Sequence, residues 1–213
     1  MLVGGRIKSY DGNVLTVDVP FYDVEYIIKK RVRDVQVYIE DGRHISADQR
    51  KKLYATFNDI SEYTGHMPEY VKEFMKYDFI SATGCKHFSL SNVDMSTAKE
   101  FLEHVIEFCV EWGIPTKDSL LERTPDIARY VYKCAMKKTC CISGKKAELH
   151  HLDAVGMGRN RKDIIHLGME VIPLSITLHK EAHNIGKKSF CEKYHVHGVI
   201  ADEEICKNYN LKY

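Results

Sequence analysis

The sequence lacks the features that mark several large classes of protein. No apolar run reaches the ~18 residues that a membrane-spanning helix needs. The first residues, MLVGGRIKSYDGNV, have no basic start followed by an apolar core, as a secretory leader would. The seven cysteines follow no regular framework, which is typical of reduced thiols. We therefore expect a cytoplasmic protein with no membrane partner.

The charge of the chain is balanced in total but uneven along the sequence. There are 31 Lys+Arg against 30 Asp+Glu in the 213 residues. Residues 133–198, however, contain 12 basic and 6 acidic side chains, together with seven of the 11 histidines. The remainder is therefore acidic. A basic, histidine-rich segment joined to an acidic one indicates two domains with different partners.

The first 123 residues have the pattern of strands followed by helices. Apolar alternation around Asp11 and Gly12 predicts a hairpin, and residues 31–43 alternate in the same way. Ser46 and Gln49 have the spacing of a capping box, which predicts the start of a helix. Helices are expected to end at Gly65 and at Gly113. Others are expected to begin at Pro68 and at a second capping box of Thr97 with Glu100. We interpret residues 1–123 as an α+β domain and residues 124–138 as a linker helix.

Two pairs of histidines lie in the basic segment. His150 and His151 are neighbours on a predicted strand, where successive side chains point to opposite faces, so we expect them to have different roles. His179 and His183 are spaced i, i+4 on a predicted helix that ends at Gly186. This spacing places both imidazoles on one face of the helix, where they can bind one metal ion.

The order of strand, long loop, strand and helix, with histidines on the first strand and on the helix, resembles the HNH nuclease family. The resemblance covers about residues 140–198 and implies a small ββα-metal nuclease domain in residues 139–213. It implies that one divalent metal ion, Mg, Mn, Ni or Zn, is bound by His150, His179 and His183. It also implies that His151 is the general base that activates water.

These roles agree with what phosphodiester hydrolysis requires. A divalent ion can hold the scissile phosphate and stabilise the leaving oxygen. An imidazole that titrates near neutral pH can take a proton from water. The loop GMGRNRK adds Arg159, Arg161 and Lys162, here called the basic loop, which we expect to contact DNA phosphates without sequence preference.

The sequence departs from the family pattern in its cysteines and in the residue that orients the base, and it adds His195 and His197 near the C-terminus. Many HNH proteins bind a structural zinc through two Cys-x-x-Cys pairs, but here Ser143 stands three residues after Cys140 and a second pair is missing. We therefore expect no structural zinc, and expect Cys140 and Cys141 to be core residues. The asparagine that orients the base in the family has no obvious counterpart, and either His166 or Glu170 is a candidate.

Two stretches of the N-terminal region, residues 45–65 and 86–114, resemble the Orf-type recombination mediators of phage lambda and its relatives. This resemblance implies single-stranded or branched DNA and single-strand-binding protein as partners in a bacterial host cell, and a homodimer. We interpret the chain as a metal-dependent HNH endonuclease of phage recombination. A non-catalytic Orf-type mediator and a structural metal-binding domain are the alternatives. His151 distinguishes the endonuclease from both alternatives, because a purely structural metal site does not need an additional base.

Overall fold

The computed structural model describes residues 5–20, 24–30, 42–152 and 165–213. Helices dominate these ranges, and the strands form two small antiparallel sheets, so the expected α+β class is confirmed. No helix in the described ranges is long and apolar enough to cross a membrane. Most of the predicted strand over residues 31–43, and the whole basic loop, lie outside the described residues.

The N-terminal sheet is a hairpin of β1 (Arg6–Tyr10) and β2 (Leu15–Asp18), in which Ile7 pairs with Val17. Its turn follows from the side chain of Asp11, whose carboxylate accepts hydrogen bonds from the backbone N–H groups of Asn13 and Val14, at 3.1 and 2.8 Å. Gly12 adopts a φ of 97°, which is unfavourable for residues with a Cβ atom. The predicted hairpin is therefore confirmed. A short helix, α1 (Val24–Lys30), comes next in the chain.

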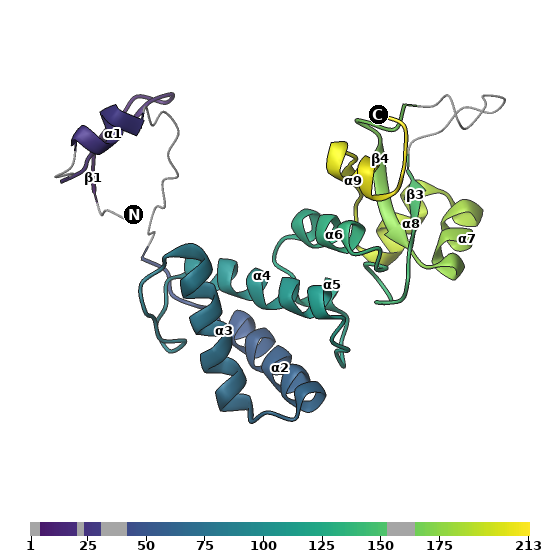
Figure 1. Cartoon of the computed structure of the whole chain (residues 1–213), viewed down its shortest axis with the longest axis horizontal. Coiled ribbons are helices and arrows are strands. Elements are labelled where there is room, and N and C mark those ends of the chain that lie inside the picture. Colours follow the sequence, from purple (N-terminus) through teal and green to yellow (C-terminus); the bar gives the residue numbers. More distant parts are fainter. Residues whose placement is uncertain (1–4, 21–23, 31–41, 153–164) are drawn as a thin grey trace.

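The central part consists of three long helices, α2 (Ala47–Thr64), α3 (Pro68–Thr83) and α4 (Met95–Trp112). Helix α2 packs against α3 and α4, and large side chains such as Phe57, Met75 and Phe101 are buried between them (Figure 1). Ser46 forms both hydrogen bonds of the predicted capping box with Gln49.

The predicted start of α4 is wrong by three residues. The helix begins at Met95 rather than after Thr97, because the carboxylate of Asp94 accepts a hydrogen bond from the backbone N–H of Thr97 at 2.8 Å. An aspartate is as good an N-cap as a threonine, and the acidic residue has the advantage of charge at this end of the helix dipole. The predicted end at Gly113 is confirmed, where the backbone is left-handed.

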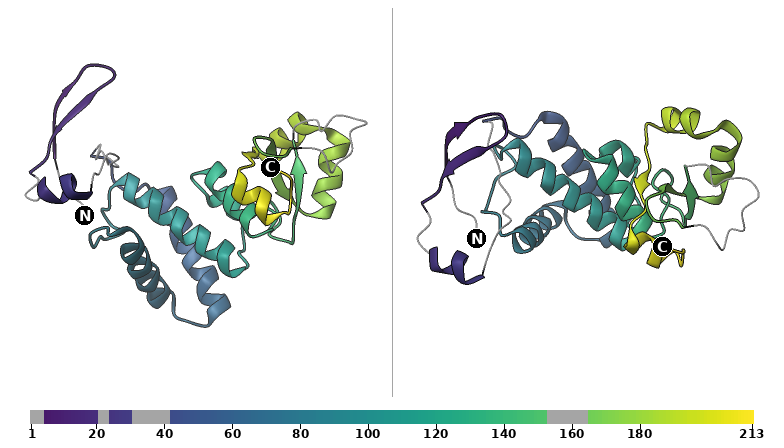
Figure 2. Two further views of the ribbon diagram at one scale, coloured as in Figure 1. Left: turned by 45° about the horizontal axis from the view of Figure 1, so that its top comes forward. Right: turned by 90° about the horizontal axis from the view of Figure 1, so that it is seen from above.

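The predicted linker over residues 124–138 contains α6 (Ile127–Met136), which follows the short helix α5 (Leu120–Arg123). Helix α6 contacts α4, and it also contacts the C-terminal sheet and α9 (Glu203–Asn208). One cluster of buried side chains extends from Ile45 through α2, α4 and α6 to Val196. Figures 1 and 2 show α4 and α6 between the remaining long helices and the C-terminal sheet. The division into domains at residues 123 and 139 stays a prediction.

The C-terminal sheet has the order β3 (Glu148–His151), β4 (Glu170–Leu174) and β5 (Val199–Ile200), all antiparallel. Helix α7 (Ile176–Ile185) follows β4 directly and contacts both β3 and β4. Helix α8 (Lys187–Tyr194) then leads to β5. The two strands and the helix that follow residue 147 therefore have the predicted ββα order.

Candidate metal and catalytic site

The register of β3 against β4 directs His150 and His151 to opposite faces of the sheet. His150 lies opposite Ile172 in the ladder, and Ile172 belongs to the same buried cluster as Ala182 of α7. His151 lies opposite Val171, which packs in a second cluster with side chains of α6 and α9. One face of the sheet is therefore covered by α7, and His150 is on that face.

Three imidazoles meet between β3 and α7. The ring of His150 lies 4.7 Å from the ring of His179 and 4.7 Å from that of His183, measured between centroids. The rings of His179 and His183 stack at 5.0 Å, as their i, i+4 spacing on α7 allows. One potential ligand atom from each ring lies within 4.8 Å of the others. We call these three residues the histidine cluster. They are the three residues that the sequence predicts as metal ligands.

The chemistry of His150 suits a metal ligand. Burial lowers the pKa of His150 to about 4, and the neighbouring His179, His183 and His151 lower it in the same direction. The imidazole is therefore neutral at physiological pH, and a nitrogen lone pair is available for coordination. Its Nδ1 atom is buried and has no hydrogen-bond partner among the described residues. A buried ring nitrogen without a partner is costly, and a bound cation would satisfy it.

His179 has a carboxylate neighbour that was not predicted from the sequence. Its Nδ1 atom lies 3.1 Å from a carboxylate oxygen of Glu148 on β3. Glu148 precedes His150 by two residues, so both side chains lie on the same face of the strand. The i, i+2 spacing of an acidic residue and a predicted ligand on one strand would have identified this contact.

His151 is paired on its own face of the sheet. Its Nε2 atom lies 2.8 Å from Nδ1 of His166, and the two ring centroids are 4.8 Å apart. His166 is buried, and its burial lowers the pKa of the ring. The other candidate for this position, Glu170 on β4, accepts a hydrogen bond from the ammonium group of Lys187 at 2.5 Å. Of the two alternatives that the sequence leaves open, the structure brings His166 into contact with His151.

Cys140 and Cys141 are both fully buried, as expected for core residues. The backbone N–H of Ser143 lies 3.4 Å from the sulfur of Cys140, in a tight turn that ends at Gly144. In the ranges that the structure describes, the histidine cluster is the one group of three or more side chains placed to hold a metal ion. The predicted DNA contacts of the basic loop lie outside these ranges.

Comparison with known proteins adds one finding. Residues 17–212 match a protein family described as "Putative HNHc nuclease". The match extends well beyond the ββα segment and includes α2 to α6. Comparisons with curated proteins and with solved structures give no match.

Proposed function

This chain belongs to the HNH nuclease family, and we propose that it is a metal-dependent endonuclease that hydrolyses phosphodiester bonds of DNA. The observation that carries the proposal is a second imidazole site, His151 with His166, on the edge strand β3 and next in the chain to a ligand of the histidine cluster. The histidine cluster lies between β3 and α7, and His151, the next residue after His150, is paired with His166 on the other face. A metal site with a second imidazole beside it is what a hydrolase needs and what a structural site does not need.

His150, His179 and His183 would hold one divalent ion, Mg, Mn, Ni or Zn. When bound, the ion would supply positive charge to the scissile phosphate and to the leaving oxygen. Three protein ligands leave further coordination positions, as catalytic metal sites do. Glu148 would orient the ring of His179 through Nδ1, so that Nε2 is the coordinating nitrogen.

His151 would be the general base, and His166 would be the residue that positions it. Because burial lowers the pKa of His166, that ring stays neutral and its Nδ1 atom can accept a hydrogen bond. His151 would then donate its Nε2–H to His166, which would hold the ring in one tautomer and orientation while it takes a proton from water. The imidazolium that forms would keep the same hydrogen bond to His166. Glu170 is the weaker candidate for this role, because its carboxylate is engaged by Lys187.

The cellular role follows from the resemblance of the N-terminal region to Orf-type mediators. We propose that the enzyme acts on single-stranded or branched DNA during phage recombination, together with single-strand-binding protein and as a homodimer. The basic loop would add contacts to phosphates beside the site.

A comparison of single-histidine variants tests the mechanism. His151→Ala should leave metal content and DNA binding intact and lower the rate of cleavage by about two to four orders of magnitude, the usual contribution of a placed base. His150→Ala should lose metal affinity along with activity. His197→Ala changes an exposed histidine outside both sites and is the matched control. Equal loss of metal from the His150 and His151 variants would make His151 a ligand and overturn the mechanism.

The positioning role of His166 has its own test. His166→Ala should lower the cleavage rate, whereas His166→Asn should restore much of it, because the amide oxygen can accept the hydrogen bond from Nε2 of His151. A residue needed only for packing would show no such rescue. If the wild-type protein cuts no DNA substrate with any of the four metals, the non-catalytic mediator becomes the better interpretation.

A further inference from the structure

A pocket far along the chain from the histidine cluster is lined mostly by basic and hydroxyl-bearing side chains, together with Glu73 and Leu90. It has a volume of about 280 Å³ and lies where α2, α3 and the segment of residues 89–91 meet. Arg50 of α2 and both Lys72 and Lys76 of α3 line it. Helices α2 and α3 are at the opposite end of the helical part from β3 and α7 (Figure 1). The pocket is therefore separate from the proposed catalytic site.

The cations of this pocket exceed the negative charge around them. Lys72 and Lys76 each form an ion pair with a different oxygen of Glu73, at 3.4 and 3.3 Å. Burial of Glu73 raises its pKa, but the two lysines outweigh this effect and leave the pKa below its ordinary value, so the carboxylate is charged. Three cations and one carboxylate leave an excess of two positive charges. Lys76 is itself 7% exposed, and a charge buried to this degree is costly unless anions compensate it.

The pocket also contains hydrogen-bond donors. The guanidinium of Arg50 donates through Nη2 to the backbone carbonyl of Ser91 at 3.1 Å. Its Nε atom is buried and has no hydrogen-bond partner among the described residues. The hydroxyls of Ser89 and Ser91 lie 3.0 Å apart and also line the pocket. A guanidinium, two ammonium groups and hydroxyls are the donors that proteins use for phosphate.

An aromatic ring completes the lining. Tyr54 of α2 lines the pocket and is 44% exposed, and its ring makes a near-perpendicular contact with the buried ring of Phe57 at a centroid distance of 5.8 Å. An exposed ring that is held in place beside phosphate-binding cations is the arrangement on which proteins stack unpaired bases. Duplex DNA keeps its bases stacked on each other and cannot use such a ring.

We propose that this pocket binds a phosphate of a single-stranded DNA segment, with an adjacent base on Tyr54. This inference rests on the proposed function, since it names the part of the DNA substrate that the helices hold. Arg50, Lys72 and Lys76 supply the charge, and Ser89 and Ser91 supply neutral donors. The single strand is bound away from the histidine cluster, so the pocket contributes to substrate choice and not to the hydrolytic step.

The test measures binding of the full-length, metal-free protein to a labelled oligothymidylate of about 20 nucleotides, longer than one typical single-strand site. Lys72→Gln should weaken binding about tenfold, the effect of losing one hydrogen bond to a charged group. It should also reduce the slope of log K against log salt by about 0.7, the value for one phosphate of a single strand. Lys51→Gln is the matched control, because Lys51 is exposed on the same part of α2 and does not line the pocket.

A second pair of measurements separates the base contact from the charge. Tyr54→Ala should weaken binding of the oligothymidylate and leave binding of a blunt duplex of equal length unchanged. Arg50→Gln should behave like Lys72→Gln, and thermal unfolding of each variant checks that the fold is retained. If folded Lys72→Gln and Arg50→Gln bind the oligonucleotide as Lys51→Gln does, the pocket is not a phosphate site.

The failure of this inference differs from a failure of the proposed function. Wild-type protein that binds the oligonucleotide through the pocket but cuts no DNA would support the pocket and refute the endonuclease. If the wild-type protein cuts DNA and the pocket substitutions leave oligonucleotide binding unchanged, the endonuclease is supported and the pocket is refuted as a phosphate site. Wild-type protein that binds no oligonucleotide at all would overturn the pocket.

Discussion

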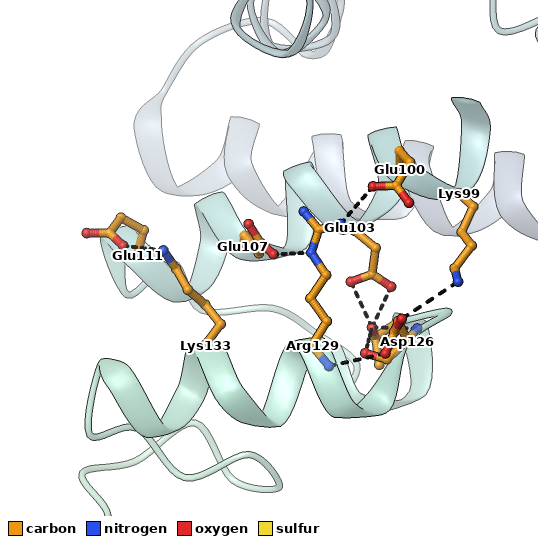
Figure 3. A network of polar contacts seen from close by, with 9 residues as sticks. Lys99, Glu100, Glu103, Glu107, Glu111, Asp126, Arg129 and Lys133 are labelled. Carbon is orange, nitrogen blue, oxygen red and sulfur yellow. Dashed lines mark hydrogen bonds and ion pairs between the residues drawn. The ribbon is translucent and has the colours of Figure 1, made fainter. Parts of the chain in front are cut away.

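Substitution of Glu103 by glutamine should remove a pH dependence from the stability of the fold. Glu103 lies on α4 and is 1% exposed, and its two carboxylate oxygens accept from the hydroxyl of Thr124 at 3.0 and 3.2 Å. Arg129 of α6 is close by but pairs with Glu100 and Glu107 instead, at 2.7 and 2.5 Å (Figure 3). The buried carboxylate is therefore poorly compensated.

The pKa of Glu103 gives the size and the sign of the effect. Burial raises the pKa from the ordinary 4.5 to about 7, against the opposing influence of the Thr124 hydrogen bond and of Arg129. Between these two values the folded protein keeps the proton and the unfolded chain releases it. Stability therefore falls as the pH rises from about 4.5 to about 7, and stays at the lower level above that. The loss is about 3 kcal/mol, since each pH unit of difference between the two states is worth about 1.4 kcal/mol.

Glu103→Gln keeps the shape of the side chain and an oxygen that can accept from Thr124, but it cannot ionise. The variant should equal the wild type at pH 5 and exceed its free energy of unfolding by about 2–3 kcal/mol at pH 8. Urea unfolding of both proteins at pH 5, 6, 7 and 8 measures this difference. Glu107→Gln, on the same helix but paired with Arg129, is the control and should show no gain at pH 8. Parallel stability curves for wild type and Glu103→Gln would refute the reasoning.

Three further predictions concern the nuclease part. Metal analysis of the purified protein should find one divalent ion per chain. The double variant His179→Ala, His183→Ala should bind no metal, and metal retained by this variant would refute the ligand set. Gly198→Ala should destabilise the fold by about 1–3 kcal/mol in thermal unfolding, because a Cβ atom there would lie 2.8 Å from the backbone oxygen of Val171; an unchanged midpoint would contradict this. Alanine at all three cations of the basic loop should weaken DNA binding for every sequence. It should also lower the slope of log K against log salt by about one per lost contact. Binding equal to wild type at every salt concentration would show that the loop does not contact phosphates.

Local patterns predicted those parts of the fold that depend on neighbours in sequence. The capping box at Ser46 and the end of α4 at Gly113 are confirmed, because both depend on contacts within a few residues. The i, i+4 pair on α7 was also predictable, since helix geometry alone brings His179 beside His183. The start of α4 was not predictable in this way, because Asp94 and Thr97 are both good N-caps and the sequence pattern does not indicate which of them is used.

Contacts between distant segments could not be predicted in the same way. The choice between His166 and Glu170 as the neighbour of His151 depends on where residue 166 returns to the sheet, and its backbone N–H is bonded to the carbonyl of Lys212 near the C-terminus. The pocket of Arg50 and Lys72 depends on how α2 packs against α3. Neither arrangement has a short-range signal in the sequence.

The strand β3 explains why two identical side chains can have different functions at adjacent positions. Its ladder pairs His150 with Ile172, toward α7, and His151 with Val171, toward the other face. A shift of β3 by one residue against β4 would exchange the two faces and place His151 beside the helix. The apolar neighbours oppose such a shift, because it would also turn Leu149 out of its cluster with Val171 and expose the buried side of the strand. The same hydrophobic register that stabilises the sheet therefore keeps the proposed metal ligand and the proposed base apart, although a single peptide bond joins them.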